Sequence, residues 1–465
     1  MVIQVRRTLR VARMNAIEEC RELVFADYRR KTPRSAGLFA RARKVMPGGV
    51  SGNLRYFAPH PLYMSSGDGC MTVDVDGNEY IDCFSCNGPL LLGHRPKALS
   101  AVADEIETVG SLIVNPTLMI ECAEALQRVI PSAEHVRFLN SGTEAVMSAV
   151  RCARAYTGKD YVVKFFGHYH GQDDQFLLGV APSRAAFGAG IPEAHLENTL
   201  TSPFNNVEAI EKLLSERDDV ACVILDPAMH SGGLWGASKE FLSAVREATR
   251  KAGVILIFDE VITGFRLGLG GAQEYYGVTP DLTTLAKALA AGEKLGAVVG
   301  SAEVMSVFDP QAAAATPRAF QSGTGNDGSG ALTAAIGAIA EYERLAATGR
   351  YQILWDQVEQ FDVALRAIFE ASSIPMKTNR LCSMMQLFHS SQPPSFEKYA
   401  GLNNAVVELF YLALINEGVL LSLPTSNHIY FSFAHDEEAF STILQAVTAV
   451  LEKYPFQPAF AEINQ

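Results

Sequence analysis

Two side chains with catalytic potential, the acid Asp259 and the amine Lys287, stand 28 residues apart in the sequence. Asp259 follows an apolar run at 254–258, and Lys287 follows a run of apolar and small polar residues at 282–286. Short runs of this kind are typical of buried strands, and in open α/β sheets ligands bind beyond the carboxyl ends of the strands. The pattern therefore predicts an acid and an amine at one ligand-binding edge of a sheet.

This pair of residues fits one specific chemistry. A lysine amine forms a Schiff base with a carbonyl cofactor such as pyridoxal 5'-phosphate (PLP). That cofactor also needs an acid beside its pyridine nitrogen, so that the ring stays protonated and accepts electrons. We interpret Lys287 as the Schiff-base residue and Asp259 as the acid. From these residues alone, an exposed acidic pair at 259–260 and a solvated lysine remain an open alternative.

The segments around both residues resemble the PLP site of the class III aminotransferases, which have the fold called type I. The resembling segments are IFDEVITGFR, PDLTTLAKALAAG and GAVVG, and the step from Asp259 to Lys287 is the step of the family. The resemblance is greatest to the subgroup that contains glutamate-1-semialdehyde aminomutase, and it extends from about residue 38 to the C-terminus. It implies an α/β fold, with a large domain whose mostly parallel sheet is covered by helices, and a smaller α+β domain.

An SGT motif lies between the strand predicted at 136–140 and the helix predicted at 142–157. Ser141 can cap that helix, and the free backbone N–H groups of its first turn favour an anion. An ordinary helix cap without a ligand is the alternative from these residues alone. The resemblance implies that Gly142 and Thr143 bind the cofactor phosphate, with Ser141 adjoining them.

Three further residues are expected around the cofactor ring, two of them at positions of the family motifs and Val261 from the strand period. Tyr169, in a Tyr-His-Gly motif, is expected to stack on the pyridine face and to fix the ring plane. Val261 is two residues past Asp259 and is expected to pack under the ring. Asp226 closes the strand predicted at 221–226, where the family usually has a glutamate. The resemblance implies a contact of Asp226 near the ring hydroxyl.

A glycine-rich loop, GTGNDGSG at 323–330, contains the Gly323-Thr324 pair of the family. The resemblance implies that Thr324 reaches the phosphate of the neighbouring subunit's cofactor, and therefore a homodimer with shared active sites. A flexible linker is the alternative from the loop alone. Lys294, in AAGEKLG, is a second candidate for the Schiff-base residue. We prefer Lys287 because of its spacing and because it closes a predicted strand.

Arg55 lies in the loop PGGVSGNLRYF at 47–57, where the resembling subgroup has an arginine that faces the substrate carboxylate. A guanidinium is a two-pronged donor for a carboxylate and stays charged when partly desolvated. We therefore expect an aminotransferase that moves an amino group from a carboxylate-bearing donor to a keto acid or aldehyde acceptor. The alternative is an aminomutase, which returns the amine to another carbon of the same molecule. A nucleotide-binding or regulatory protein on the same α/β layout is disfavoured, because no Rossmann glycine motif follows a first strand and no P-loop motif occurs.

Composition excludes several other classes of protein. The chain has 465 residues, of which 48% are hydrophobic, and a formal net charge of −12, which does not favour nucleic acid. No apolar stretch is long enough to span a membrane. Eight dispersed cysteines are typical of a reduced, cytoplasmic protein, and the single Cys83–Cys86 pair is too weak a signal to predict a metal site. The first thirteen residues are basic, and we interpret them as an exposed start, with an organelle transit peptide as the alternative.

Strands and helices alternate through the middle of the chain, which predicts a mostly parallel sheet covered on both faces. We expect an N-terminal segment (1–92) that joins the small domain and the active site, a large PLP-binding domain (93–338) and a C-terminal small domain (339–465). Within the first segment we expect one helix at 14–47 and a hairpin at 71–83. The remaining predicted strands are 161–165, 254–259, 282–286, 297–301, 381–388 and 428–433, and the remaining helices are 93–108, 207–217, 238–252, 331–347, 400–417 and 436–453.

Overall fold

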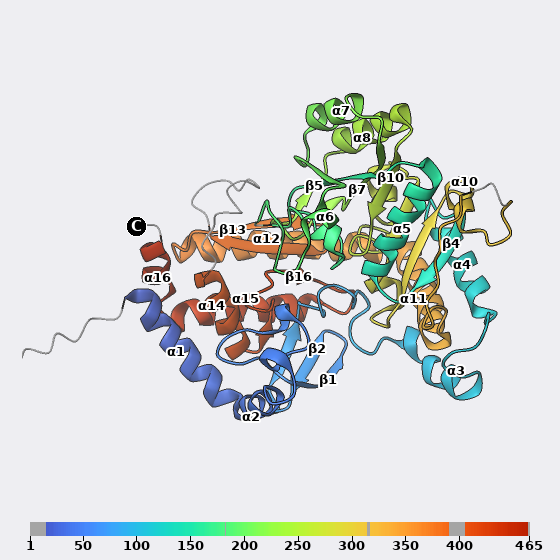
Figure 1. Cartoon of the computed structure of the whole chain (residues 1–465). Coiled ribbons are helices and arrows are strands. Elements are labelled where there is room, and N and C mark those ends of the chain that lie inside the picture. The colour runs from blue at the N-terminus through green and yellow to red at the C-terminus, as the bar shows by residue number, and fades with distance from the viewer. Residues whose placement is uncertain (1–14, 182, 314–316, 390–404, 464–465) are drawn as a thin grey trace, which may run out of the picture.

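The computed structural model describes residues 15–181, 183–313, 317–389 and 405–463 (Figure 1). A seven-stranded sheet forms its centre, in the order β4-β12-β11-β10-β7-β5-β6. Six of the strands were predicted close to their observed places, and β6 was not predicted. The strands are β4 (His135–Leu139), β5 (Tyr161–Phe165), β6 (Thr199–Ser202), β7 (Val220–Leu225), β10 (Ile255–Asp259), β11 (Leu282–Leu285) and β12 (Gly296–Gly300).

The predicted mostly parallel sheet is confirmed, with one exception. β12 is antiparallel to both of its neighbours, β11 and β4, whereas the other pairs of this sheet are parallel. β12 is the second strand of the sheet, and β4 forms the edge beside it. The carboxyl ends of β4, β5, β7, β10 and β11 therefore meet at one edge, as strand ends do in an open parallel sheet.

Helices cover both faces of this sheet, and side chains alternate between the two faces along each strand. On β10, Ile257 packs in the cluster under α5 (Gly142–Thr157), whereas Leu256 packs in the cluster with α8 (Lys239–Ala252). Both helices have caps that fix their ends. The Ser141 side chain accepts from the Glu144 backbone N–H, and α5 ends at a left-handed Gly158. The α8 helix likewise begins after a capping serine and ends before a left-handed glycine.

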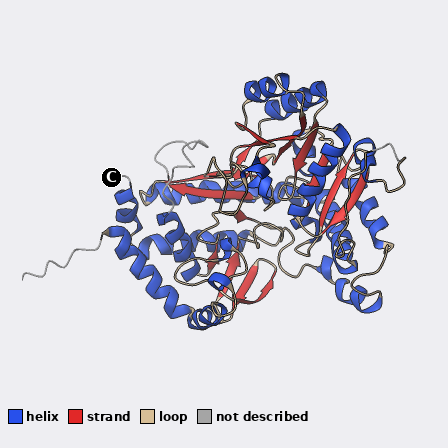
Figure 2. Cartoon of the chain, in the orientation of Figure 1, coloured by secondary structure: helices blue, strands red, loops and turns tan. Residues whose placement is uncertain are grey.

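A second body of the protein combines both ends of the chain. Cys20, Val24 and Tyr28 of α1 (Ala16–Lys31) share one apolar cluster with residues of the C-terminal helices. Figures 1 and 2 show α1 beside those helices, away from the large sheet. The helices concerned are α12 (Arg350–Ala371), α14 (Ala405–Asn416), α15 (Glu437–Lys453) and α16 (Phe456–Ile463). Residue 338 lies inside α11 (Ser329–Ala347), and the boundaries after residues 92 and 338 stay predictions.

Two small sheets complete this body. One has the order β1-β2-β3-β15 and the other β13-β14-β16. The hairpin predicted at 71–83 is confirmed by β2 and β3. Their strands are β1 (Met64–Asp68), β2 (Met71–Asp74), β3 (Glu79–Asp82), β13 (Met376–Leu381), β14 (Met384–His389), β15 (Val419–Leu420) and β16 (Ile429–Tyr430). No helix in the described ranges is long and apolar enough to cross a membrane.

Three predicted elements are wrong in form. The helix predicted at 14–47 is two helices, α1 and α2 (Pro33–Ala42), because Pro33 has no N–H group to continue α1. The strand predicted at 381–388 spans the turn of a hairpin, where Cys382 has φ 51°. Of the helix predicted at 93–108, only α3 (Val102–Thr108) and a short 3-10 turn form, and α4 (Leu118–Val129) was not predicted. Residues 1–14 and 400–404 lie outside the described ranges.

Candidate active site

A cavity of about 320 Å³ lies at the carboxyl edge of the large sheet. Both residues of the initial prediction line it, one from the end of β10 and the other from the turn after β11. The structure therefore brings together nearly all the residues predicted for the cofactor. The lining residues that the sequence singled out are Ser141, Gly142, Thr143, Tyr169, Asp226, Asp259, Val261, Lys287 and Lys294.

Asp259 is held by three hydrogen bonds at the end of β10. Its Oδ1 accepts from the Thr284 hydroxyl at 3.1 Å and from the Val261 backbone N–H at 3.2 Å, and its Oδ2 lies 2.7 Å from His170 Nδ1. Both Asp259 and His170 are buried. His170 Nε2 has no hydrogen-bond partner among the described residues. An acid fixed on every side can hold a cationic group of a ligand in one orientation.

Lys287 places its amine in the same cavity from a left-handed backbone conformation, with φ 49°. This conformation is unfavourable for a residue with a side chain, and such strain is concentrated at functional sites. Burial lowers the pKa of the Lys287 amine to about 8, against the negative charges of Asp259 and Asp226, which raise it. A lysine with a pKa near neutrality is a nucleophile under ordinary conditions.

This titration gives a first testable expectation. In the apoprotein, acylation of the Lys287 amine should follow pH with a midpoint near pH 8, because only the neutral amine reacts. Asp259→Asn should move the midpoint down, since it removes a charge that stabilises the ammonium form. Mass spectrometry of the Lys287 peptide measures both midpoints. An upward movement in the variant would contradict this electrostatic account.

The start of α5 forms a cradle opposite this amine. The Gly142 and Thr143 backbone N–H groups belong to the first turn of α5. The N–H groups of a first turn have no carbonyl acceptor within the helix and can therefore bind a ligand. A Cβ atom on Gly142 would lie 2.9 Å from both methyl carbons of Val261, so that only glycine fits there. The helix N-terminus and its backbone donors favour an anion such as a phosphate.

The loop after β5 closes another side of the cavity. It carries Tyr169, whose ring is half-exposed at the cavity wall, and Gly171, which has φ +92°. A Cβ atom on Gly171 would lie 2.6 Å from Thr143 Oγ1, and the Gln172 N–H donates to that oxygen at 3.4 Å. Glycine therefore lets this loop approach the α5 cradle closely.

Asp226 reaches the cavity from the end of β7 in a network of its own. Its Oδ2 lies 2.8 Å from His230 Nδ1, and its Oδ1 accepts from the Ala228 N–H at 2.9 Å. Burial and the charge of Asp259 raise the pKa of the Asp226 carboxyl. Burial also lowers the pKa of His230 to about 3, so this imidazole is neutral near pH 7. Asp226 is shorter than the glutamate that is usual in the family, and its carboxylate is held by His230, four residues later in the chain.

A buried amine, an acid and an anion cradle around one cavity recur in a known family. The family model described as Aminotransferase class-III matches residues 56–330. The chain belongs to the class III aminotransferases. Glutamate-1-semialdehyde 2,1-aminomutase of Archaeoglobus fulgidus is 37% identical to it over 427 residues, which are 90% of this chain and 100% of that relative.

Solved structures of transaminases agree with the fold. An omega-transaminase from Sphaerobacter thermophilus has a TM-score of 0.82 at 33% identity, and the match covers 90% of this chain and 97% of the other. A transaminase with PLP bound has a TM-score of 0.83 at 33% identity, with coverages of 93% and 99%. This class III enzyme therefore has fold type I, and its cofactor is PLP.

The residues of the cavity fit that cofactor by their chemistry. PLP carries an aldehyde, a ring nitrogen and a phosphate, and the cavity offers an amine, an acid and backbone donors at a helix N-terminus. His170, which lines the cavity and lies 2.7 Å from Asp259 through Nδ1, has a buried Nε2 without a hydrogen-bond partner in the described chain. Within the described ranges, no group of three or more His, Cys, Asp or Glu side chains could hold a metal ion.

Two predicted residues do not line the cavity of this class III enzyme. Arg55 ends the 3-10 turn Asn53–Arg55 and is exposed, and Thr324 is exposed in the loop before α11. His170, which follows Tyr169 directly, is a functional residue that the sequence did not predict. Only the fold places its Nδ1 against Asp259. The available signal was an imidazole next to the residue predicted to stack on the cofactor ring.

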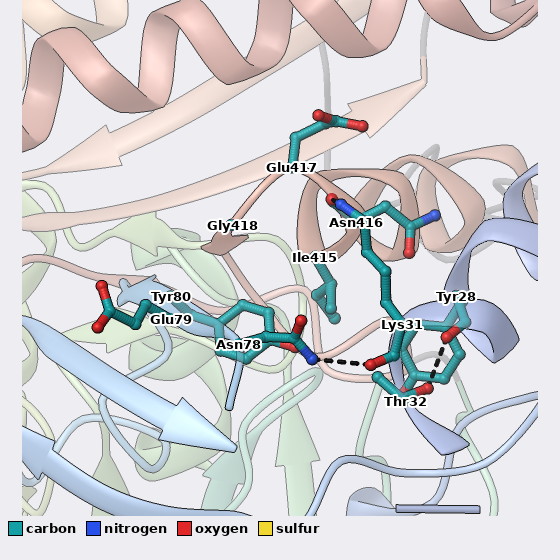
Figure 3. Close-up of a pocket in the computed structure, with 10 residues that line it drawn as sticks. All are labelled: Tyr28, Lys31, Thr32, Asn78, Glu79, Tyr80, Ile415, Asn416, Glu417 and Gly418. Atoms are coloured by element: carbon teal, nitrogen blue, oxygen red, sulfur yellow. Dashed lines mark hydrogen bonds between the residues drawn. The ribbon is translucent and has the colours of Figure 1, made fainter. Parts of the chain in front are cut away.

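A second cavity, of about 310 Å³, lies between the ends of α1 and α14 and the start of β3 (Figure 3). Its polar groups bond largely to one another: the Asn78 amide donates to the Lys31 carbonyl at 2.9 Å, and the Thr32 hydroxyl donates to the Tyr28 carbonyl at 2.6 Å. None of the predicted catalytic or cofactor residues lines it. We therefore assign it no ligand.

Proposed function

We propose that the enzyme moves an amino group within one molecule, as a glutamate-1-semialdehyde 2,1-aminomutase does by its name. The observation that carries the proposal is the full-length likeness to such enzymes at more than a third identity. The cavity at the carboxyl edge of the sheet is the proposed site. Its proposed substrate is a small amino aldehyde that bears a carboxylate.

Each predicted residue has a definite part in this proposal. Bound PLP supplies an electron sink for the carbon that loses a proton. Lys287 would hold the cofactor. Its free amine would carry a proton between the reacting carbon of the substrate and that of the cofactor. The Asp259 carboxylate, oriented by Thr284 and His170, keeps the ring nitrogen protonated.

The remaining cavity residues bind and orient in the same proposal. The α5 cradle at Gly142 and Thr143 binds the phosphate, and Ser141 fixes the helix end. Tyr169 and Val261 enclose the ring from two sides of the cavity, and the Asp226 network lies near its hydroxyl.

Intermolecular transamination is a second candidate function. It is favoured by the 33% identity to an omega-transaminase of known structure. Asp226 also stands where the family usually has a glutamate. In this reaction a keto acid or aldehyde takes up the amine that the first substrate leaves behind.

One experiment separates the two candidates. The purified enzyme is given glutamate-1-semialdehyde alone, and the isomer with the amine on carbon 1 is measured with and without added pyruvate. The proposal expects steady isomer formation with no added acceptor. A reaction that stops after one turnover, and resumes only when pyruvate is added, would replace it with transamination.

We also propose that the enzyme works as a homodimer with shared sites. Thr324 lies in the loop before α11, and the start of α11 bonds to a neighbouring segment through the Ser329 N–H and the Ser111 carbonyl at 3.2 Å. That segment exposes apolar side chains that a monomer leaves in water, which marks an interaction surface. They are Ile106, Val109, Leu112, Ile113 and Val114.

The shared site can be tested by mixing two inactive variants. Thr324→Asp should weaken binding of the phosphate to the neighbouring subunit, and Lys287→Ala removes the proposed attachment point. A mixed dimer then has one site with both residues intact, so refolded mixtures should regain up to about a quarter of the normal activity. Co-refolding followed by an activity assay measures this. A mixture as inactive as its components, or a fully active monomer, would refute the shared site.

Arg55 is proposed to bind the substrate carboxylate when the site is assembled. Arg55→Ala should raise KM for carboxylate substrates about ten- to a hundredfold, the range that a lost charge-assisted hydrogen-bond pair implies. Activity toward uncharged amines should change little. Arg41→Ala removes an equally exposed arginine of the neighbouring helix α2 and is the matched control. An unchanged KM in Arg55→Ala would remove this residue from the site.

A reducing compartment such as the cytoplasm is the proposed location of the enzyme. All eight cysteines are free in the structure, and six of them are buried. Burial raises the pKa of the Cys122, Cys152 and Cys222 thiols to about 12, which leaves them unreactive and in agreement with a reduced protein.

A further inference from the structure

Arg266 is a fully buried cation that no acid of the described residues neutralises. It follows β10 by seven residues, is 1% exposed, and has no carboxylate partner among the ion pairs of the described chain. A buried charge without a counter-ion is costly and persists only where its surroundings solvate it. The mechanism proposed above gives this residue no part.

The Arg266 guanidinium is bound instead by neutral oxygens from three separate segments. Nη1 donates to the Ser383 hydroxyl at 3.1 Å and to the Phe431 carbonyl at 2.9 Å, and Nη2 donates to the Gly88 carbonyl at 2.8 Å. The guanidinium also lies over the Tyr430 ring at 5.1 Å. Arg266 thus joins the large domain to both the N-terminal and the C-terminal parts of the chain.

The segment that ends at Gly88 has an unusual backbone. Ser85, Cys86, Asn87 and Gly88 all have positive φ, at 49°, 52°, 71° and 103°. The left-handed region is unfavourable for residues with a Cβ atom, and runs of such residues are rare. The contacts around this turn must therefore supply the energy that holds it.

Tyr430, whose ring lies under the Arg266 guanidinium, also contacts this turn and the residues beside it. The Tyr430 N–H donates to the Cys83 carbonyl at 2.6 Å, and the Ser85 hydroxyl donates to the Tyr430 carbonyl at 3.2 Å. A Cβ atom on Gly88 would lie 3.3 Å from the Tyr430 ring. Arg266 and Tyr430 therefore clamp the turn from one side.

The turn leads directly into the wall of the active site. Pro89 follows Gly88 and lines the cavity. Leu90 lies close to Gly292, which is five residues after Lys287 in the same segment. A Cβ atom added to Gly292 would be only 2.9 Å from Leu90 Cδ2. A displacement of the turn would move both contacts.

We propose that Arg266 is a positioning residue, whose guanidinium holds the left-handed turn at 85–88 and thereby fixes Pro89 and Leu90 against the active-site cavity. The inference rests on the proposed site at Lys287 but not on which amino-transfer reaction occurs there. The planar fork of arginine is needed, because lysine offers no fixed geometry for oxygens on three segments.

The test uses the cofactor-loaded enzyme and hydrogen–deuterium exchange of the peptide 83–92. In Arg266→Lys and Arg266→Met, exchange there should rise at least about tenfold, because the clamp that keeps the turn closed is lost. KM for the amino substrate should rise more than kcat falls, since a displaced wall weakens binding of substrate and transition state alike. Arg246→Lys is the matched control: Arg246 is a buried arginine of α8 paired with Asp281 at 2.9 Å, and its loss should leave exchange at 83–92 unchanged.

A double variant distinguishes positioning from general stabilisation. Gly88→Ala disturbs the same turn by adding a Cβ atom against Tyr430. If Arg266 acts through the turn, Gly88→Ala should reproduce the KM effect of Arg266→Lys, and the double variant should be no worse than the stronger single variant. Unchanged exchange at 83–92 in a folded Arg266 variant, or fully additive KM effects, would overturn the proposal. If the Arg266 variants do not fold, a normal KM in Gly88→Ala would overturn it.

Discussion

Lys287→Ala is expected to abolish amino transfer while leaving the fold and the cofactor cavity in place. The variant loses the attachment point of the cofactor and the amine that carries the proton, and proton transfer alone is worth up to a factor on the order of 10⁴. PLP should still bind through the α5 cradle and the acid at the ring nitrogen, without a covalent bond. Steady-state kinetics, together with dialysis of the cofactor-loaded variant, measure both effects.

Lys294→Ala is the control for this variant, because Lys294 lines the same cavity and is the rival attachment point. It is expected to keep most of the activity and to hold its cofactor covalently. If Lys294→Ala is inactive and Lys287→Ala is active, Lys294 is the attachment point of the cofactor and Lys287 is not.

Asp259→Asn is expected to reduce turnover by about 10² to 10³ or more. An amide no longer stabilises a protonated ring nitrogen, and an electrostatic contribution of this kind is worth about 3 kcal/mol or more. The shape of the side chain and its contact with Thr284 are largely kept, so the loss should fall on kcat with only a small effect on stability. Kinetics and thermal unfolding of the same preparation separate the two quantities.

The matched control is Asp281→Asn at the beginning of β11. Asp281 accepts from the Leu256 N–H at 2.8 Å and pairs with Arg246, so it stabilises the same sheet away from the cavity. It should lose stability without a comparable loss of kcat. Near-normal turnover in Asp259→Asn, or an equal loss in Asp281→Asn, would show that another acid faces the ring.

The residues of the cavity could be predicted from sequence because each lies next to a strong local signal. Asp226 and Asp259 end buried strands, Ser141 caps a helix, and the strand ends of a parallel sheet meet at one edge. The family resemblance then supplied their roles. These signals depend only on neighbouring residues. They therefore hold even where helices or strands in other parts of the chain were predicted wrongly.

Long-range features could not be predicted in this way. The position and antiparallel direction of β12 depend on pairing with β4, a strand 157 residues earlier at the register Gly296–Leu139. The clamp around Arg266 joins residues 88, 383 and 431, which no spacing rule connects. Arg55 and Thr324 match family positions, yet a single chain does not bring them to the cavity wall.

PLP is expected to bind through Lys287 in the cavity at the carboxyl edge of the large sheet. The most direct test is to reduce the cofactor-loaded enzyme with borohydride, digest it, and map the peptide that carries the cofactor label. The account predicts one label, on Lys287, and its loss in Lys287→Ala. A label on Lys294, or on any residue outside this cavity, would contradict it.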